Sequence, residues 1–247
     1  MTGLPALAAS ERSGGTATVP TSLLAAERIE RVYPRERCIA LSGVTLSLNR
    51  GEYAAVTGPS GSGKSTLLHL LAGLDRPDAG RILFEGRAPR SASEWASIRA
   101  RRIGFVFQAF HLLPTLTARQ NVEVPMFGIV ADARARRRRA DDLLARVGLA
   151  DRARHRPPQL SGGEKQRLAI ARSLANAPAA ILADEPTGTL DSGSAAAVLD
   201  LLEAVRSEVG ALLVLVTHDP GIAARADRRI TLHDGRIISD SRVPGEA

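Results

Sequence analysis

Residues 52–74 read EYAAVTGPSGSGKSTLLHLLAGL, and this stretch decides the fold. Its first part, 52–58, is an apolar run typical of a buried strand, and KSTLLHLLAGL (64–74) has the apolar spacing of a helix. GPSGSGKST (58–66) lies between them and matches G-x-x-x-x-G-K-[ST], the pattern of a glycine-rich loop that joins a strand to a helix and cradles phosphates. The stretch therefore predicts an α/β domain with a phosphate-binding loop.

This loop contains each group that a nucleotide and its metal ion require. Backbone N–H groups of the turn surround the β- and γ-phosphates, and the positive end of the helix adds to the attraction. Lys64 adds a point charge to those phosphates, and the hydroxyl of Ser65 can ligate Mg²⁺. We expect the nucleotide to contact the whole loop: Gly58, Pro59, Ser60, Gly61, Ser62, Gly63, Lys64, Ser65 and Thr66.

Patterns elsewhere in the chain predict the strands and helices around this loop. Short alternating segments between residues 27 and 49 predict an N-terminal antiparallel β subdomain. Apolar strand-like runs and helical patterns follow, at residues 81–86, 103–108, 116–177, 179–184, 192–208, 212–218 and 230–239. Because apolar strands alternating with helices are typical of a parallel sheet covered on both faces, we expect a mostly parallel sheet. The helical stretch is too long for one crossover, so we expect an α-helical subdomain, about 109–177, inserted in the core.

Composition and charge limit the class of protein. The 247 residues are 44% hydrophobic, which suits one α/β domain with a real core. The net charge of +7 is compatible with nucleic acid, an anionic membrane face or nucleotide phosphates, and we interpret RARRRR (134–139) as a solvated helix face. No apolar run reaches the roughly 18 residues that span a bilayer, and the single cysteine, Cys38, excludes an intramolecular disulfide. We expect a cytoplasmic protein that can dock on a membrane protein, ordered over 24–240, with tails at 1–23 and 241–247.

Polar side chains come at the ends of three predicted strands. Asp184 ends AAILAD and can hold Mg²⁺, while Glu185 follows it and suits a general base that orients an attacking water. His218 ends LLVLVTH, where it can contact the γ-phosphate, and Gln108 ends IGFVFQ, where a neutral amide can ligate Mg²⁺ or a water. The expected catalytic residues are Glu185, His218, Lys64 and Gln108, and the expected metal ligands are Ser65, Gln108 and Asp184.

A second glycine-containing stretch, LSGGEKQR (160–167), resembles another phosphate-binding element. Ser161 and Glu164 are spaced as a capping box at the start of a helix. The two glycines between them leave backbone N–H groups accessible to a phosphate. One nucleotide site in one chain does not need two such elements.

In order along the chain, these motifs resemble those of the ATP-binding subunits of ABC transporters, over about residues 24–240. Gln108 matches the family's Q-loop and Tyr33 lies where the family often has an aromatic side chain that stacks on adenine. The other matches are GPSGSGKST to Walker A, LSGGE (160–164) to the signature motif, ILADE (181–185) to Walker B, GTLD (188–191) to the D-loop and THD (217–219) to the H-loop. The resemblance implies a P-loop NTPase (RecA-like) core that binds and hydrolyses ATP with Mg²⁺.

The resemblance also implies a dimer that explains the second glycine-containing stretch. Such subunits work as head-to-tail pairs, in which each ATP lies between the Walker A loop of one chain and the signature motif of the other. The nucleotide-binding set then includes Ser161, Gly162 and Gly163, with Asp191 of the D-loop. In relatives, the junction formed by Gln108 and residues 109–114 receives a short helix from a membrane permease.

The segment 103–126 and PTGTLDS (186–192) are similar to a narrower subfamily that serves lipoprotein release, macrolide efflux and antimicrobial-peptide export. This implies an integral-membrane permease with four spans and a large external domain, an export or extraction reaction, and a location on the inner face of the cell membrane. The partner ATPase is a second copy or a paralogous subunit. Two alternatives stay open: an ATPase that regulates a permease-like partner without transport, as in cell division, and a soluble ABC ATPase acting on nucleic acid.

Overall fold

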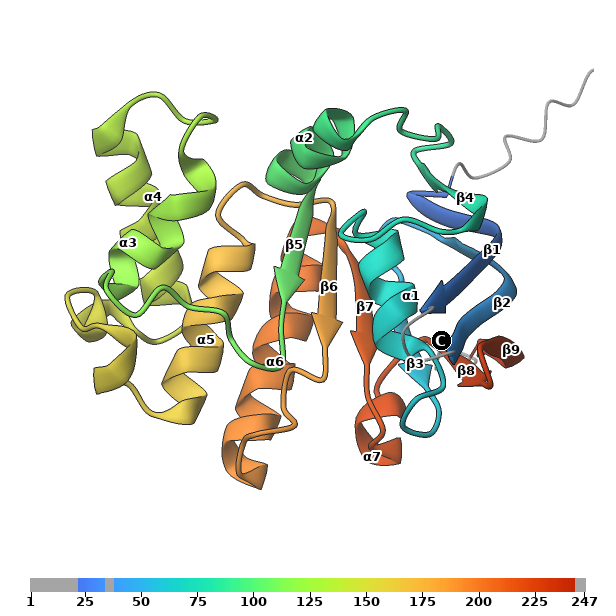
Figure 1. Ribbon diagram of the computed structural model, residues 1–247. Coiled ribbons are helices and arrows are strands. Elements are labelled where there is room, and N and C mark those ends of the chain that lie inside the picture. The colour runs from blue at the N-terminus through green and yellow to red at the C-terminus, as the bar shows by residue number, and fades with distance from the viewer. Residues whose placement is uncertain (1–21, 34–37, 243–247) are drawn as a thin grey trace, which may run out of the picture.

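Two sheets organise the computed structural model, which describes residues 22–33 and 38–242 (Figure 1). The smaller sheet is antiparallel and has the order β2 (Cys38–Leu48), β1 (Leu24–Tyr33), β4 (Ala79–Phe84). The larger sheet has the order β5 (Ile103–Val106), β6 (Ala180–Asp184), β7 (Leu212–Val216), β3 (Tyr53–Thr57), β8 (Arg228–His233), β9 (Arg236–Arg242). Its strands are parallel apart from β9, which pairs with β8 in the antiparallel sense. The predicted fold class is confirmed.

Helices cover the large sheet on both faces. On one face, α1 (Lys64–Leu71) lies between the two sheets, and its leucines join β1, β2 and β3 in one apolar core. On the other face lie α5 (Gly162–Ser173), α6 (Ser192–Val209) and α7 (Pro220–Ala223), whose apolar side chains form a second core. The strands β3, β6 and β7 are buried almost throughout because both of their faces are covered, which explains why their residues do not alternate.

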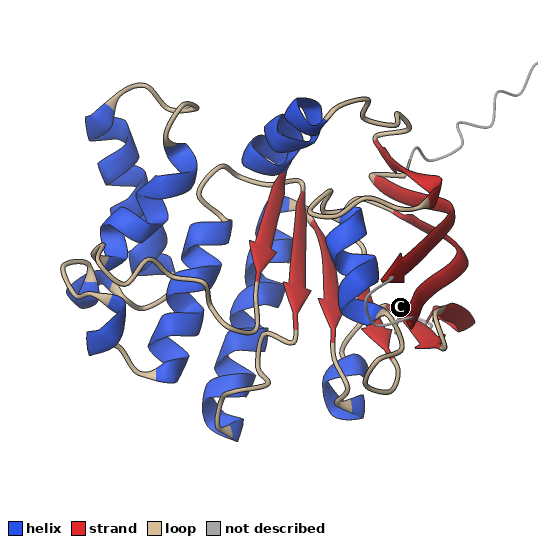
Figure 2. Ribbon diagram, in the orientation of Figure 1, coloured by secondary structure: helices blue, strands red, loops and turns tan. Residues whose placement is uncertain are grey.

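A group of helices occupies much of the range between β5 and β6 (Figure 2). They are α3 (Ala118–Glu123), η1 (Val124–Met126), α4 (Ala133–Arg146), η2 (Ala150–Arg152), η3 (Pro157–Gln159) and α5. Because α5 contacts α3 and α4 on one side and β5 and α6 on the other, it ties this group to the sheet. The glycine at 104 permits the close approach, since a Cβ there would lie 2.5 Å from the carbonyl oxygen of Ser173.

The periodicity predicted neither the four-residue helix α7 nor the longer α2 (Ala92–Arg102). Ser91 caps the start of α2, and its hydroxyl accepts a hydrogen bond from the Glu94 N–H at 3.1 Å. None of its residues is fully buried, and only Trp95 and Ile98 pack partly against the core. A helix with so narrow an apolar face leaves a weak periodic signal in the sequence.

The predicted tails lie mostly outside the described residues, at 1–21 and 243–247. Within the described part, Leu23 is buried and its N–H donates to the carbonyl of Leu48 at 2.8 Å, while Ser241 and Arg242 belong to β9. Among the helices of residues 22–33 and 38–242, none has the length and apolar character to cross a membrane.

Candidate active site

The carboxyl ends of the parallel strands and the amino ends of α1, α5 and α6 meet at one edge of the large sheet, the lower edge in Figure 1. Ligands of open α/β sheets bind at this edge because loops and helix amino termini converge there. α1 lies on one side of β5, β6 and β7, and α5 lies on the other (Figure 1). The phosphate-binding loop and the signature-like stretch are therefore at the same edge but on opposite sides of it.

The phosphate-binding loop is held in a fixed shape by its own lysine. Lys64 is 7% exposed, and its Nζ donates to the carbonyls of Gly58 at 2.9 Å and Pro59 at 2.8 Å. Gly63 caps α1 with φ of 97°, and a Cβ there would lie 2.2 Å from the carbonyl oxygen of Ala40 on β2. Only glycine both adopts this φ and leaves room for the Ala40 carbonyl, so the loop backbone can lie in direct contact with β2.

A cavity of about 330 Å³ opens over this loop. Its lining joins parts of the chain that are far apart in sequence: Tyr33, Ala40, Ser60, Gly61, Gly63, Lys64, Ser65, Thr66 and Glu185. The cavity thus combines a fixed cation, backbone N–H groups at a helix start, a carboxylate and an aromatic ring. These groups suit the phosphates and the base of a nucleotide.

The predicted metal ligands Ser65 and Asp184 are in direct contact. The Ser65 hydroxyl donates to Asp184 Oδ1 at 3.0 Å, and His69 Nε2 lies 4.0 Å from Asp184 Oδ2. Burial raises the pKa of the Asp184 carboxyl above its usual value, and the Ser65 hydrogen bond partly offsets this effect. Within the described part of the chain, no group of three or more His, Cys, Asp or Glu side chains could hold a metal ion. One hydroxyl and one carboxylate instead suit Mg²⁺ that also binds nucleotide phosphates.

Glu185, His218 and Gln108 gather at the same strand ends. His218 Nδ1 lies 3.2 Å from Glu185 Oε1. A Cβ on Gly188 would lie 3.2 Å from Gln108 Nε2 and 3.4 Å from Glu185 Oε2, which places the amide and the carboxylate beside the same residue. The strands end earlier than predicted, since β5 stops at Val106 and β7 at Val216. Gln108 and His218 therefore lie in the turns that follow and are exposed.

The capping box at the start of α5 is confirmed. The Glu164 N–H donates to the Ser161 hydroxyl at 3.2 Å, and the Ser161 N–H donates to Glu164 Oε2 at 2.8 Å. That second bond, with Arg152, lowers the pKa of Glu164. Ser161 and Gly162 are exposed, and Gly163 packs against Ser194 of α6. None of Ser161, Gly162 and Gly163 is among the described residues that line the cavity over the phosphate-binding loop.

Asp191, the last predicted nucleotide ligand, caps α6. Its carboxylate accepts a hydrogen bond from the Ser194 N–H at 2.9 Å, and this bond lowers its pKa. Asp191 is exposed, and the helices that Asp191 and Ser161 cap, α6 and α5, both begin at the lower edge of the sheet in Figure 1. Within the chain, Asp191 thus orders the loop after β6 and does not line the cavity.

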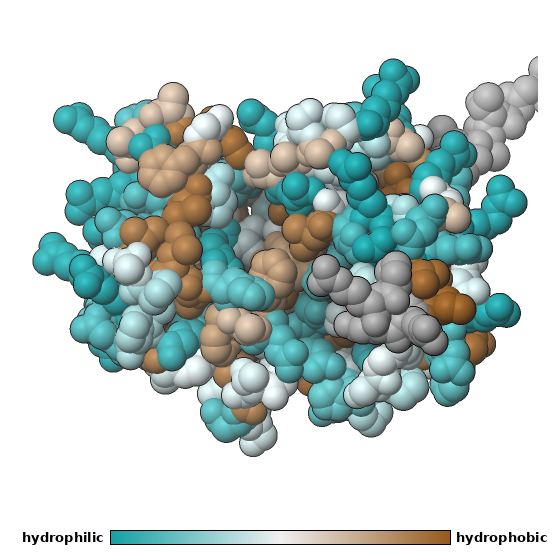
Figure 3. Space-filling model, viewed as in Figure 1, coloured by the Kyte–Doolittle hydropathy of each residue, from teal (hydrophilic) through white to brown (hydrophobic). Residues whose placement is uncertain are grey.

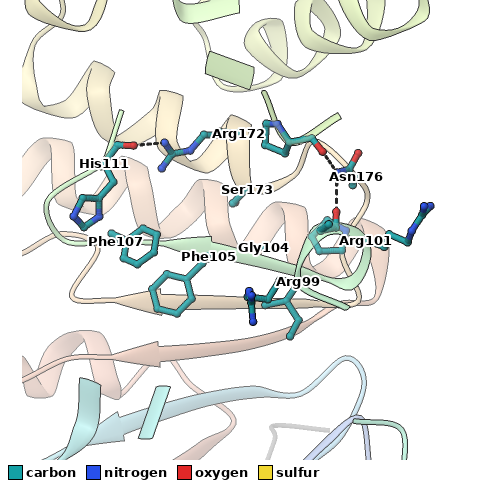
Figure 4. A pocket seen from close by; sticks show the side chains of 13 residues that line it. Arg99, Arg101, Gly104, Phe105, Phe107, His111, Arg172, Ser173 and Asn176 are labelled. Carbon is teal, nitrogen blue, oxygen red and sulfur yellow. Dashed lines mark hydrogen bonds between the residues drawn. The ribbon is translucent and has the colours of Figure 1, made fainter. Parts of the chain in front are cut away.

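A second cavity, of about 280 Å³, lies beside β5 and reaches α2 and α5 (Figure 4). Phe105 and Phe107 project into it side by side, with ring centroids 4.2 Å apart, and His111 meets the Phe107 ring edge-on at 4.6 Å. Arg172 of α5 donates to the carbonyls of His111 and Phe110, the latter at 2.7 Å. Burial lowers the pKa of Arg172. The turn after Gln108 is thereby fastened to α5.

Two residues at these sites were missed in the sequence. Arg172 lies within a helical pattern, where its two carbonyl partners some 60 positions away leave no sign. Asp75 precedes the turn RPDAG (76–80), and it accepts a hydrogen bond from the Tyr33 hydroxyl at 3.1 Å. Both contacts join distant segments, so a single sequence could not reveal them.

Comparisons with known proteins agree with this arrangement. A family model described as ABC transporter matches residues 41–188. The lipoprotein-releasing system ATP-binding protein LolD 1 of Caulobacter vibrioides is 50% identical over 233 residues, which are 91% of this chain and 98% of that protein. The macrolide export ATP-binding/permease protein MacB 1/2 of Paracoccus denitrificans is 50% identical over 225 residues. The match covers 89% of this chain but only 33% of that relative.

Among solved structures, the chain is similar to the ATP-binding cassette MJ0796 in a dimeric post-hydrolysis state bound to ADP and Pi. The TM-score is 0.83 and the identity 39%, covering 90% of this chain and 99% of that one. The resemblance to the lipoprotein-release and macrolide-efflux subfamily is confirmed. Since the family model spans more than half of the chain and a relative is half identical along nearly all of it, the chain belongs to the ABC transporter family, as an ATP-binding and ATP-hydrolysing domain.

Proposed function

We propose that this chain binds Mg-ATP in the cavity over the phosphate-binding loop and that its hydrolysis drives a membrane permease. The observation that supports this most strongly is the lining of that cavity, where Lys64, Ser65 and Glu185 face one space. Lys64 and the loop N–H groups hold the phosphates, and Ser65, Asp184 and Gln108 hold the magnesium ion. The bound ion neutralises charge that develops on the phosphates.

Glu185 acts as the general base in this proposal. Its carboxylate lines the cavity and takes a proton from the attacking water. His218, 3.2 Å from Glu185, orients that carboxylate and reaches toward the γ-phosphate. Gln108 lies beside Gly188 with Glu185 and adds an uncharged ligand, so it does not repel the phosphates.

The start of α5 serves the nucleotide of a second copy. Ser161 and Gly162 are exposed at the nucleotide edge but do not line their own chain's cavity. In a head-to-tail pair they cap the γ-phosphate that Lys64 of the other chain holds, with Gly163 and Asp191 ordering the same surface. The dimeric state of the cassette MJ0796 supports this arrangement.

The cavity beside β5 receives the permease. It is lined by Phe105, Phe107 and His111, and the turn that forms it begins at Gln108. Apolar surface gathers over the helical group in Figure 3, and Leu113 and Phe127, in the segment that follows β5, are exposed. A short apolar helix of a four-span permease with a large external domain docks there. This places the chain on the inner face of the membrane, and the names LolD and MacB favour extraction or export.

The substitution Glu185→Gln tests the mechanism. The variant removes the base and leaves the loop intact, so it should bind ATP while turnover falls at least about a hundredfold. ATP then accumulates in a closed dimer, which light scattering should detect as a doubling of mass that ADP does not cause. A variant that stays monomeric at saturating ATP would contradict the sandwich, and one that hydrolyses ATP at the parent rate would exclude Glu185 as the base.

A further inference from the structure

We infer that Asp75, together with Arg31, positions the Tyr33 ring for the nucleotide base. The inference rests on the proposed function, because it assigns a role within the same cavity. Tyr33 is the last residue of β1 and the aromatic side chain among the residues that line the cavity. An aromatic ring contributes to affinity only when it is held face-on to the base, so whatever fixes the ring sets part of the affinity.

The hydroxyl end of Tyr33 is fixed by Asp75. The phenol donates to Asp75 Oδ2 at 3.1 Å, and the same oxygen lies 2.9 Å from Arg31 Nε. The Arg31 and Asp75 side chains are only 21% and 28% exposed, so water screens this ion pair less than a surface pair. A hydrogen bond to a carboxylate whose charge is balanced in this way holds the ring at its far end.

One face of the ring is covered by Arg31. The guanidinium carbon lies 4.8 Å from the ring centroid, within the range of a cation–π contact. A base can therefore stack only on the opposite face. Arg31 and Asp75 together leave the ring one orientation and one free face.

A second carboxylate fastens this arrangement to the strand. Asp78 accepts from Arg31 Nη1 at 2.9 Å and from the Val32 N–H at 2.7 Å. Asp78 also donates its own N–H to the carbonyl of Glu30 at 2.8 Å. The turn after α1 thus contacts both the backbone and the side chains at the end of β1.

This turn links the two ends of the nucleotide site. Lys64 and Ser65 stand at the start of α1, and the N–H groups of Leu74 and Asp75, just past its end, donate to the carbonyl of His69. One short rigid helix therefore fixes the distance between the phosphate-binding groups and the residue that holds Tyr33. The phosphates and the base are positioned by the same element.

The test compares a ligand that has a base with one that lacks it. Titration calorimetry with Mg-ADP and with Mg-pyrophosphate measures both affinities for the parent chain and for Asp75→Ala, Tyr33→Phe and the double variant. Loss of the hydrogen bond should weaken ADP binding by about threefold to tenfold and leave pyrophosphate binding unchanged. The double variant should bind ADP no more weakly than Asp75→Ala alone. Asp142→Ala, at an exposed aspartate of α4, is the matched control and should bind both ligands like the parent.

The outcomes separate this inference from the proposed function. A parent chain that binds no ADP would overturn the proposed function and the role of Asp75 with it. A parent that binds ADP while Asp75→Ala binds it equally well would overturn the role of Asp75 alone. Equal losses for ADP and pyrophosphate would mean that Asp75 supports the phosphate loop and not Tyr33, which also overturns it. If Asp75→Ala does not fold, Tyr33→Phe, which removes only the hydroxyl, decides the question by the same two affinities.

Discussion

At the scale of single residues, the strand end at Asp184 and Glu185 is arranged for chemistry at some cost in stability. Burial raises the pKa of Asp184, with Glu185 adding to the effect, so keeping the Asp184 carboxylate charged costs folding free energy. Glu185 has a φ of 42°, in the left-handed region that disfavours residues with a side chain. Both features are typical of functional sites, where local strain is retained because the reaction needs it.

The substitution Asp184→Asn should separate stability from activity. Because the folded-state pKa is raised above 3.8, the unfavourable contribution of the carboxylate grows as pH rises through the folded-state value and is complete at neutral pH. Asparagine removes this cost and still accepts the Ser65 hydrogen bond, so Tm at pH 7 should rise. Without the charged ligand, Mg-dependent hydrolysis should fall at least about a hundredfold. Asp142→Asn should change neither quantity, and a lower Tm for Asp184→Asn would contradict the cost assigned to burial.

At the scale of elements, the start of α5 combines a structural and a functional role. Ser161 and Glu164 close a capping box, and the same chemistry begins α3, where Thr117 and Gln120 form one. The box of α5 encloses two glycines and begins a helix at the nucleotide edge, whereas the box of α3 encloses Ala118 and Arg119. Comparing the two capping boxes therefore distinguishes the contribution of a cap to stability from the contribution of its position to function.

Ser161→Ala and Thr117→Ala should destabilise the chain alike but differ in activity. Each removes one cap hydrogen bond, which costs about 1 kcal/mol of unfolding free energy. ATP hydrolysis should fall about tenfold or more in Ser161→Ala and stay near the parent rate in Thr117→Ala, while monomeric ADP affinity stays unchanged in both. Steady-state ATPase rates and urea unfolding check this. Equal ATPase rates for the two variants would mean that Ser161 is only a cap.

The arginines of helix α4 also differ in role, since some are part of the packing and others are exposed. Arg136 donates to the carbonyls of Val130 and Ala131, both at 2.8 Å, and covers the Phe127 ring at 4.7 Å. Arg134, Arg137 and Arg138 are exposed. The interpretation as a solvated face thus suits these three positions, whereas Arg136 is part of the packing.

We expect little effect when Arg134, Arg137 and Arg138 are all replaced by glutamine in one variant. Its ATPase rate should stay within about twofold of the parent rate, and its Tm should stay within about 2 °C of the parent Tm. Arg136→Gln should lower Tm by roughly 2–4 °C, because two carbonyls lose their donor. Thermal unfolding followed by circular dichroism and a phosphate-release assay give both quantities. A large ATPase loss in the triple variant would show that the exposed arginines act on the nucleotide or the dimer.

At the scale of the whole molecule, two apolar cores meet at the large sheet, and α5 joins the helical group to it. The junction depends on Gly104 of β5, whose backbone touches the carbonyl of Ser173 at the end of α5. The permease-binding cavity proposed above lies along the same strand, beside Phe105 and Phe107. The distance between β5 and α5 therefore affects both stability and the shape of that cavity.

Gly104→Ala should move α5 away from β5. The added Cβ would lie 2.5 Å from a backbone oxygen, so the backbone must shift, at a cost of about 1–3 kcal/mol of unfolding free energy. Tm should then fall by roughly 3–10 °C in thermal unfolding. Gly193→Ala is the control, because its Cβ would lie 3.5 Å from the nearest atom and alanine favours the helix α6. An unchanged Tm in Gly104→Ala would mean that α5 adjusts freely to β5.

Much of the fold followed from local patterns. The apolar runs at 52–58 and 179–184 predicted buried strands because both faces of each strand are covered, and the glycine-rich loop predicted the helix after it. The helix α2 was missed because its apolar periodicity is weak, since it touches the core only through Trp95 and Ile98. The strand ends at Val106 and Val216 were also missed, because the apolar Phe107 follows Val106 and the β-branched, buried Thr217 follows Val216.

The sequence by itself determined the motifs, since each is a local pattern whose residues are set by one turn, one strand end or one helix start. It determined that Lys64 and Ser65 begin a helix and that Ser161 caps another. Only the tertiary structure decided that Tyr33 is held by Asp75, across 42 positions, and that Arg172 holds the turn after Gln108. Such contacts depend on how strands and helices pack, and no local pattern of residues predicts the packing between distant segments.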